Sequence, residues 1–222
     1  MTRNSSPAAN LNLWKKRLGV VPESVWEQTA LETLVLADNE LTEISPRIAG
    51  LKKLRMLDLG HNLLSAVPET MGELSGLTDF LYLHDNRLTA LPAGLGRLTR
   101  LRYLNIGENP FGEFPECVCA MAGLIELRAT DCGLREVPGS IGKLGRLREL
   151  HLRNNKLSSL PGEIGLLREL RLLDLRGNPL ADLPGEIAGL PRLEKLDLRW
   201  VSGLVEPAWL GDLEARGCVI YR

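Results

Sequence analysis

The chain has 222 residues, of which 44% are hydrophobic and 25% are charged, and these are the proportions of a folded protein. Its formal net charge is −1, so no overall positive field favours nucleic acid as a partner. No apolar run approaches the length of a membrane-spanning helix, and the N-terminal residues lack the apolar stretch of a signal peptide. We therefore expect no membrane span and no nucleic-acid partner.

The N-terminal residues are predicted to form a tail and a cap. Residues 1–9 are mostly small or polar, and we expect them to be flexible. Residues 10–30 keep Leu11, Leu13 and Leu18 in register with the units that follow, so we interpret them as a degenerate N-terminal capping repeat. Trp14 and Trp26 lie in this segment and are interpreted mainly as packing within the cap.

Residues 31–204 repeat the pattern LxxLxLxxNxL. Successive copies lie 23 residues apart, with one step of 24. The closing position is occupied by Asn39, Asn62, Asn86, Asn109, Cys132, Asn155 and Asn178. A unit of this length cannot bury its own leucines, so we expect the copies to stack around one continuous core.

Each unit is predicted to contain a strand, a turn and a short helical segment. In residues 147–157, leucines point inward while Glu149, His151 and Arg153 alternate with them, as in a half-buried strand. Asn155 then turns the chain, and its amide can satisfy buried backbone groups. The phrase LPxxIGxL follows, with its proline suited to the first position of a helical or 3₁₀ turn.

The step of 24 residues places one extra residue between Leu77 and Leu81. A β-bulge there would redirect Asp79 or Phe80. A tolerated insertion without that consequence is the alternative, and the sequence leaves both open.

Residues 205–222 are predicted to form a C-terminal cap. The segment EPAWLGDLEARG is interpreted as a helix that ends at Gly217, and CVIYR as a last strand. Trp200 and Trp209 are again assigned mainly to cap packing, although Trp14 and Trp200 also fall at positions that could face a ligand.

The four cysteines form neither a disulfide framework nor a paired metal clamp. They are Cys117, Cys119, Cys132 and Cys218. We interpret them as structural thiols, with Cys132 buried, and expect a reducing, cytoplasmic compartment. Export without a cleavable signal peptide stays open.

The combined phrase LxxLxLxxNxLxxLPxxIGxLxxL resembles the 23-residue class of leucine-rich repeats over about residues 10–204. It is most similar to intracellular Ras-group leucine-rich proteins of plants and animals and to their bacterial counterparts. The resemblance implies an α/β fold, a right-handed leucine-rich-repeat solenoid or horseshoe with a parallel concave β-sheet and short helices or 3₁₀ turns on the convex side. Cys132, Val201 and Ser45-Pro46 depart from the pattern.

Aligned on the repeat, the outward-facing strand residues form columns across the predicted sheet. Four apolar or aromatic residues adjoin one another there, and we call them the aromatic patch: Met56, Phe80, Tyr82 and Tyr103. Such residues are typical of binding hot spots, although ordinary packing between strands would also place them together. His84 follows Tyr82 and could belong to the same site, but an exposed polar strand residue is the simpler interpretation.

A second group, the arginine ladder, consists of Arg153, Arg176 and Arg199, with Arg128 and His151 beside it. These side chains could bind acidic groups or phosphates of a partner. The neighbouring Asp174, Asp197, Glu126 and Glu149 could instead pair with them.

No nucleophile, acid pair or phosphate loop stands out from the repeats, so we predict no catalytic residue, no cofactor and no metal site. The expected function is that of a non-catalytic protein–protein interaction module, for which the resemblance implies a partner protein on the concave face. The alternative is the substrate-recognition arm of a larger enzyme or signalling complex, such as a kinase or ubiquitin ligase, or a bacterial effector. We expect a monomer whose partner offers an apolar anchor and acidic groups.

Overall fold

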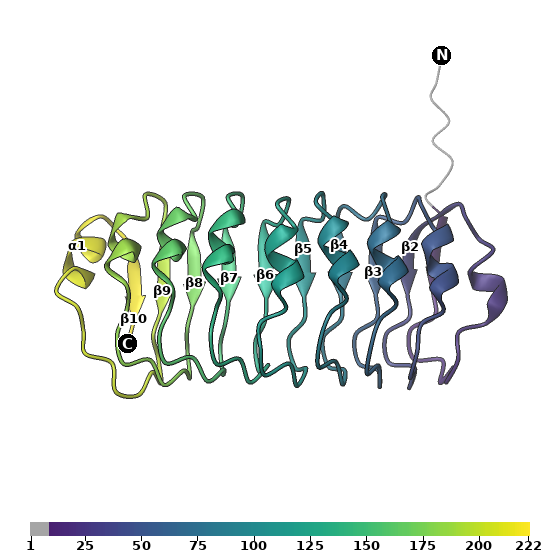
Figure 1. Cartoon of the computed structure of the whole chain (residues 1–222), viewed down its shortest axis with the longest axis horizontal. Helices are drawn as coiled ribbons and strands as arrows, with labels where there is room; N and C mark the ends of the chain where they lie inside the picture. Colours follow the sequence, from purple (N-terminus) through teal and green to yellow (C-terminus); the bar gives the residue numbers. More distant parts are fainter. Residues whose placement is uncertain (1–8) are drawn as a thin grey trace, which may run out of the picture.

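The computed structural model describes residues 9–222 as a single row of stacked coils (Figure 1). The predicted tail, residues 1–9, lies outside the described residues except for Ala9. Each coil contributes one strand to a parallel sheet whose order follows the chain from β1 to β10. The strands are β1 (Ala9–Asn12), β2 (Leu31–Val35), β3 (Met56–Asp58), β4 (Phe80–Tyr82), β5 (Tyr103–Asn105), β6 (Glu126–Arg128), β7 (Glu149–His151), β8 (Leu172–Asp174), β9 (Lys195–Asp197) and β10 (Val219–Tyr221).

A 3₁₀ turn lies on the opposite side of most coils, and Figure 1 shows these turns in front of the strands. They span Glu23–Val25, Pro46–Gly50, Glu69–Glu73, Ala93–Arg97, Glu116–Ala120, Gly139–Lys143, Gly162–Leu166 and Gly185–Gly189. One α-helix, α1 (Leu210–Ala215), precedes β10. The predicted right-handed solenoid, with a parallel concave sheet and short 3₁₀ turns on the convex side, is confirmed.

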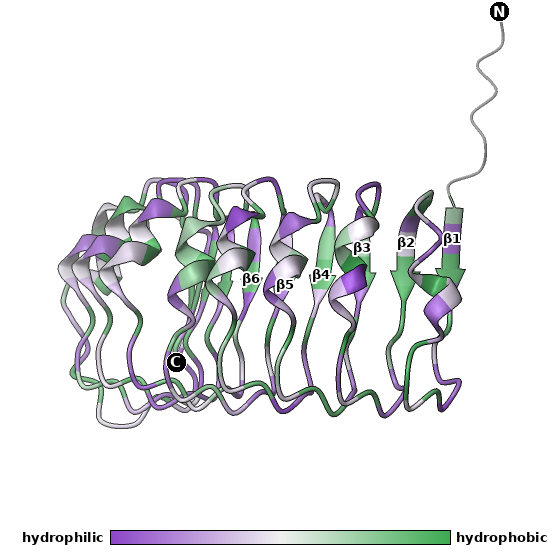
Figure 2. Ribbon diagram, turned by 45° about the vertical axis from the view of Figure 1, so that its right-hand side comes forward, coloured by the Kyte–Doolittle hydropathy of each residue, from purple (hydrophilic) through white to green (hydrophobic). Residues whose placement is uncertain are grey.

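The core is a continuous stack of leucines between the sheet and the turns. The central residue of each repeat strand is fully buried, as Leu57, Leu104 and Leu150 illustrate with 0% exposure. Hydrophobic and hydrophilic residues alternate along the coils, so every coil contributes to the same interior (Figure 2). Because each coil packs against the coils before and after it, the core grows with each added coil.

Buried asparagines hold the turn that follows each strand. Asn155 Nδ2 donates to the carbonyls of Ala129 at 2.8 Å and Leu152 at 2.8 Å. Its Oδ1 accepts from the backbone N–H of Cys132 at 3.1 Å and of Leu134 at 3.0 Å. The amide therefore satisfies backbone groups of its own coil and of the coil before it, as the sequence predicted.

The residue before each asparagine position adopts a left-handed backbone conformation. The φ values are positive at Lys15, Asp38, His61, Asp85, Glu108, Asp131, Asn154, Gly177 and Trp200. Most of these residues carry a Cβ, for which this conformation costs roughly 1–2 kcal/mol. The strain recurs in every coil because the same turn must bring the chain out of the sheet.

Cys132 replaces one asparagine with a smaller set of bonds. Its Sγ donates to the carbonyls of Ile106 at 3.4 Å and Thr130 at 3.3 Å, so the thiol takes over part of the amide's donor role. The Phe111 N–H instead bonds to the carbonyl of Asn109 at 2.9 Å. The coil geometry thus survives the substitution, and Cys132 is buried as predicted, with 1% exposure.

The inserted residue leaves the register of the strands intact. Met56 pairs with Phe80, and Phe80 pairs with Tyr103. The extra length is taken up before β4: the N–H groups of Arg102 and Tyr103 bond to the separate carbonyls of Thr78 and Asp79, both at 3.1 Å, whereas in later coils the two corresponding N–H groups share one carbonyl. The change therefore affects Asp79, whose carboxylate lies 3.0 Å from Arg55 Nη2.

Two details differ from the sequence interpretation. The prolines of the LPxxIGxL phrase stand immediately before their 3₁₀ turns, not at the first position, and Pro161 accepts the first turn bond from the Ile164 N–H at 3.1 Å. Trp26 packs in the interior as expected, but Trp14 and Trp200 are 55% and 72% exposed. The capping role of residues 10–30 and 205–222 stays a prediction.

The asparagine bonds predict the effect of removing one amide. We expect Asn155→Ala to lower the free energy of unfolding by about 1–3 kcal/mol or more, because buried backbone groups lose their partners. Urea unfolding followed by circular dichroism would measure this. Ser158→Ala removes an exposed hydroxyl from the same coil and should stay within about 0.5 kcal/mol of wild type. Equal effects of the two substitutions would contradict the structural role of the amide.

The cysteines predict slow thiol chemistry. Burial raises the pKa of Cys132 to about 12 and that of Cys117 to about 11. Since the thiolate is the reactive form, we expect Cys132 in the folded protein to react with iodoacetamide at neutral pH at least about a hundredfold more slowly than in urea. Peptide mapping of the alkylated protein would measure each site, and equal labelling of Cys132 in both states would refute the prediction.

Candidate functional site

The outward-facing columns predicted from the repeat are those of the structure. Strand pairing aligns Met56, Phe80, Tyr103 and Glu126 in one column, and Tyr82 and Arg128 lie in the next. The strands are parallel and roughly 4.8 Å apart, so neighbours in a column are in contact range. The ten predicted site residues therefore share one face but divide into two groups along it.

The first group is the aromatic patch on β3, β4 and β5. The ring centroids of Phe80 and Tyr103 lie 5.5 Å apart, and those of Tyr82 and Tyr103 lie 5.0 Å apart. Phe80 is 43% exposed, which is unusual for an aromatic residue within a strand. The patch is thus a connected aromatic surface with one exposed side chain at its centre.

The tyrosine hydroxyls of the patch stay protonated at ordinary pH. Burial raises the pKa of Tyr103 to about 12, and burial together with the charge of Asp58 raises the pKa of Tyr82. Both phenols therefore offer a donor beside an apolar ring, the combination that favours Tyr in protein interfaces.

His84 extends the patch toward the turn edge of the sheet. Its ring lies 6.0 Å from Tyr82 and 4.7 Å from His61, whose Nδ1 lies 2.5 Å from Asp85 Oδ2. Gly60 makes room for this arrangement, because a Cβ there would lie 2.4 Å from the His84 ring. Burial and the neighbouring His61 lower the pKa of His84, so the neutral imidazole is favoured.

The second group is the arginine ladder, which lies along β6 to β9. Its arginines pair with neighbouring acidic side chains. Arg176 donates to Asp174 at 2.8 and 2.5 Å, and Arg199 donates to Asp197 at 2.9 and 2.8 Å. Arg128 Nε donates to Glu126 at 2.6 Å. Because Asp174 and Asp197 are buried, with 4% and 1% exposure, their carboxylates depend on these guanidinium groups.

His151 and Arg153 are likewise engaged within the chain. His151 Nε2 lies 3.2 Å from Glu149 Oε2, and its Nδ1 lies 3.9 Å from Asp174 Oδ2. Arg153 Nη2 lies 3.4 Å from Asp131 Oδ2. The geometry of the whole ladder therefore agrees with the alternative that its charges pair with acidic residues of the same chain.

One set of ligand atoms in residues 9–222 lies close enough to hold a metal ion. Glu126, Glu149 and His151 each bring one such atom within 4.8 Å of the others. Arg128 already supplies a positive charge to Glu126 at 2.6 Å. A cation would have to compete with that guanidinium, so the ion pairs account for this cluster.

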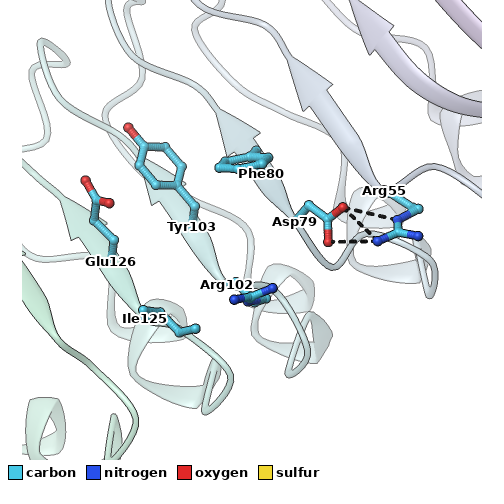
Figure 3. A pocket seen from close by; sticks show the side chains of 7 residues that line it. All are labelled: Arg55, Asp79, Phe80, Arg102, Tyr103, Ile125 and Glu126. Atoms are coloured by element: carbon cyan, nitrogen blue, oxygen red, sulfur yellow. Dashed lines mark hydrogen bonds and ion pairs between the residues drawn. The ribbon is translucent and has the colours of Figure 1, made fainter. Parts of the chain in front are cut away.

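A cavity that the columns did not predict lies beside the aromatic patch (Figure 3). Its volume is about 320 Å³, and Figure 3 shows Phe80 and Tyr103 on one side and the Arg55–Asp79 pair on the other. The lining residues are Arg55, Asp79, Phe80, Arg102, Tyr103, Ile125 and Glu126. Arg55, Asp79, Arg102 and Ile125 each precede a column residue. The sequence feature that could have indicated this cavity is the 24-residue step, because the extra residue lies next to Asp79.

The paired carboxylates predict a pH dependence of stability. Burial alone would raise the pKa of Asp174, but hydrogen bonds from Arg176 and His151 outweigh it and hold the pKa well below its ordinary value. A carboxyl whose pKa is depressed by folding stabilises the fold above its unfolded pKa, and this contribution is lost as pH falls. We expect the free energy of unfolding to decrease from about pH 5 to pH 2, and less steeply in Asp174→Asn.

Urea titrations across that pH range would measure the difference. Asp182→Asn, which removes an exposed carboxyl, is the matched control and should keep the wild-type slope. Identical slopes in Asp174→Asn and wild type would contradict the role of the Asp174–Arg176 pair.

None of the helices in residues 9–222 has the length and apolar composition required to cross a membrane. No curated protein matches the sequence. Among solved structures, a leucine-rich repeat protein of Leptospira interrogans is 29% identical, with a TM-score of 0.60 and with 90% of this chain and 63% of that chain covered. The chain is thus shorter than the protein it matches.

A plant structure is similar as well. The leucine-rich repeat ectodomain of the membrane receptor kinase GASSHO1/SCHENGEN3 from Arabidopsis thaliana, solved in complex with CASPARIAN STRIP INTEGRITY FACTOR 2, is 32% identical with a TM-score of 0.73. The match covers 86% of this chain and 24% of that ectodomain. Family models described as leucine rich repeat match residues 8–64 and 29–88, and a model of a leucine-rich repeat region matches residues 136–215. The chain belongs to the leucine-rich repeat proteins.

Proposed function

We propose that this protein is a non-catalytic interaction module that binds a partner protein on its concave face, at the aromatic patch. The observation that carries the proposal is the exposed Phe80 ring, in contact with two tyrosines on a face whose other half is filled by paired charges. Exposed aromatic residues that are already held in place lose little side-chain entropy on binding. They are therefore suited to anchor a partner.

The family supports the general role. Leucine-rich repeats are typical of protein interaction modules, and the similar Arabidopsis ectodomain was solved with a bound partner. In the same proposal we place the protein in a reducing, cytoplasmic compartment, which the four free cysteines support, and we expect it to be a monomer.

The arginine ladder is less available to a partner than its residue types predicted. Its guanidinium groups neutralise buried carboxylates, and releasing them to a partner would leave Asp174 and Asp197 unpaired. The aromatic patch can therefore bind the apolar anchor of the partner, whereas acidic groups of the partner would have to bind cations outside the arginine ladder.

A second candidate is the recognition arm of a larger enzyme or signalling complex, or a bacterial effector. The observation in its favour is that the similar Arabidopsis ectodomain is part of a membrane receptor kinase. In that arrangement the same patch would select the substrate while another domain or subunit acts on it.

The aromatic patch predicts a specific loss of binding. We expect Phe80→Ala combined with Tyr103→Ala to abolish capture of a partner from native lysate, because the anchor surface is removed. Affinity capture with quantitative mass spectrometry would compare this double variant with wild type. Circular dichroism and thermal unfolding would check that the variant folds.

Leu172→Ala is the matched control, since it removes an apolar side chain from the same column three strands beyond Tyr103. It should retain the partner. Equal capture by wild type and the folded double variant would refute the proposed site. A catalytic domain in the captured protein would favour the second candidate.

A further inference from the structure

Beside the aromatic patch, five cations surround a second cavity. We call Lys53, Arg55, Arg100, Arg102 and Arg146 the basic edge, because they lie where the chain enters the strands. The cavity has a volume of about 470 Å³, and Asp79 is the one acidic residue among its described lining. The edge is therefore strongly positive in a protein whose formal net charge is only −1.

Most of these cations have no ion-pair partner within residues 9–222. Arg55 pairs with Asp79, while Lys53, Arg100, Arg102 and Arg146 are exposed and form no salt bridge in that part of the chain. The charges at the same edge are paired from the next coil after Arg146 onward. There, Arg171 lies 3.0 Å from Glu194, and Arg192 lies 2.5 Å from Glu169. The unpaired cations are thus a local feature, not a general property of the coil edge.

The packing of the coils limits the number of acidic side chains at this edge. The position before the first leucine of each strand segment is Lys53, Gly76, Arg100, Gly123 and Arg146 in successive coils. A Cβ at Gly76 would lie 2.3 Å from the Lys52 carbonyl oxygen, and one at Gly123 would lie 2.5 Å from that of Thr99. No side chain fits at positions 76 and 123, so Asp79 is the one acidic group among these cations in the described lining, and it pairs with Arg55.

The basic edge is continuous with the cavity of Figure 3. Arg55, Asp79 and Arg102 line both cavities, and the far side of the first is formed by Phe80, Tyr103 and Ile125. A ligand that spans the two cavities would meet aromatic surface first and guanidinium groups next.

We propose that the basic edge binds the carboxylates of an extended acidic peptide segment of the partner protein, while an adjoining apolar side chain of that segment occupies the cavity beside Phe80 and Tyr103. The inference rests on the proposed function and names the chemistry of the partner. Arginine suits this role because its planar group donates two parallel hydrogen bonds to one carboxylate.

Charge complementarity favours a peptide over nucleic acid. The opposite edge of the sheet carries Asp85, Glu108 and Asp131, and Glu126 borders the cavity beside Phe80 and Tyr103. A continuous phosphate backbone crossing this face would be repelled by these groups. A peptide with a short acidic run and an apolar neighbour matches both the sign and the extent of the positive region.

The direct test is fluorescence anisotropy with a labelled synthetic peptide that carries one leucine followed by a run of glutamates. We expect saturable binding that weakens as salt is raised. Arg102→Gln combined with Arg146→Gln should weaken it roughly two- to thirtyfold, because two exposed guanidinium groups lose their carboxylate partners. Arg171→Gln combined with Arg192→Gln removes the same charge from the same edge, at sites that are already paired, and should bind like wild type.

Three comparison ligands define what would overturn the proposal. The same peptide with glutamines in place of glutamates should not bind, and equal binding of this form would refute the charge recognition. Preference for a phosphoserine peptide, or for a single-stranded oligonucleotide, would replace carboxylates with phosphate or nucleic acid as the ligand. Absence of saturable binding by the glutamate peptide would also overturn the proposal.

Affinity capture separates this inference from the proposed function. If both the patch variant and the Arg102→Gln, Arg146→Gln variant lose the partner that wild type retains, both claims are supported. If only the patch variant loses it, the aromatic anchor stands and the role of the basic edge is refuted. If both variants retain the partner, the concave-face proposal fails as well.

Discussion

The buried asparagine amide is the interaction on which the solenoid depends. Each coil leaves the sheet through a turn whose backbone N–H and C=O groups are buried away from water. If these groups had no hydrogen-bond partners, they would destabilise the fold. Asn62 meets this demand from both sides: its Nδ2 donates to Leu59 in its own coil, and its Oδ1 accepts from Asn39 in the coil before. The amide thereby fixes the distance between coils, and the left-handed residue beside it is tolerated because these bonds recur.

This constraint determines which residues are free to take part in function. Leucines, asparagines and turn prolines are committed to holding neighbouring coils together, so variation is confined to the outward columns and to the residues at the edges of the sheet. Along the columns, β4 and β5 carry aromatic side chains beside Met56 on β3, and the next four strands carry charges. The two halves of the concave face therefore differ in chemistry while sharing one backbone.

The sequence predicted the columns correctly because a period of 23 residues with one insertion leaves no freedom in the register, as the pairing of Met56 with Phe80 shows. It could not predict which charges find each other. Arg176 lies beside Asp174 and Asp197 on the surface, and only the structure shows that both carboxylates are buried beneath it. The residues before the columns were missed for a related reason: the repeat pattern does not specify them, so Arg102 appeared as one variable position among many.

The arginine ladder and the basic edge show that the position of an arginine within the coil decides whether it is free to bind a ligand. A column residue has neighbours in its own coil and on adjacent strands, so an arginine such as Arg176 can be neutralised by Asp174, two positions before it, and by Asp197 on the next strand. At the entry edge, the close approach of successive coils requires glycine at positions 76 and 123, which removes the side chains that could supply a counter-charge. Positive charge that the fold itself cannot neutralise is positive charge left for a ligand, and here it lies directly beside the exposed Phe80 ring.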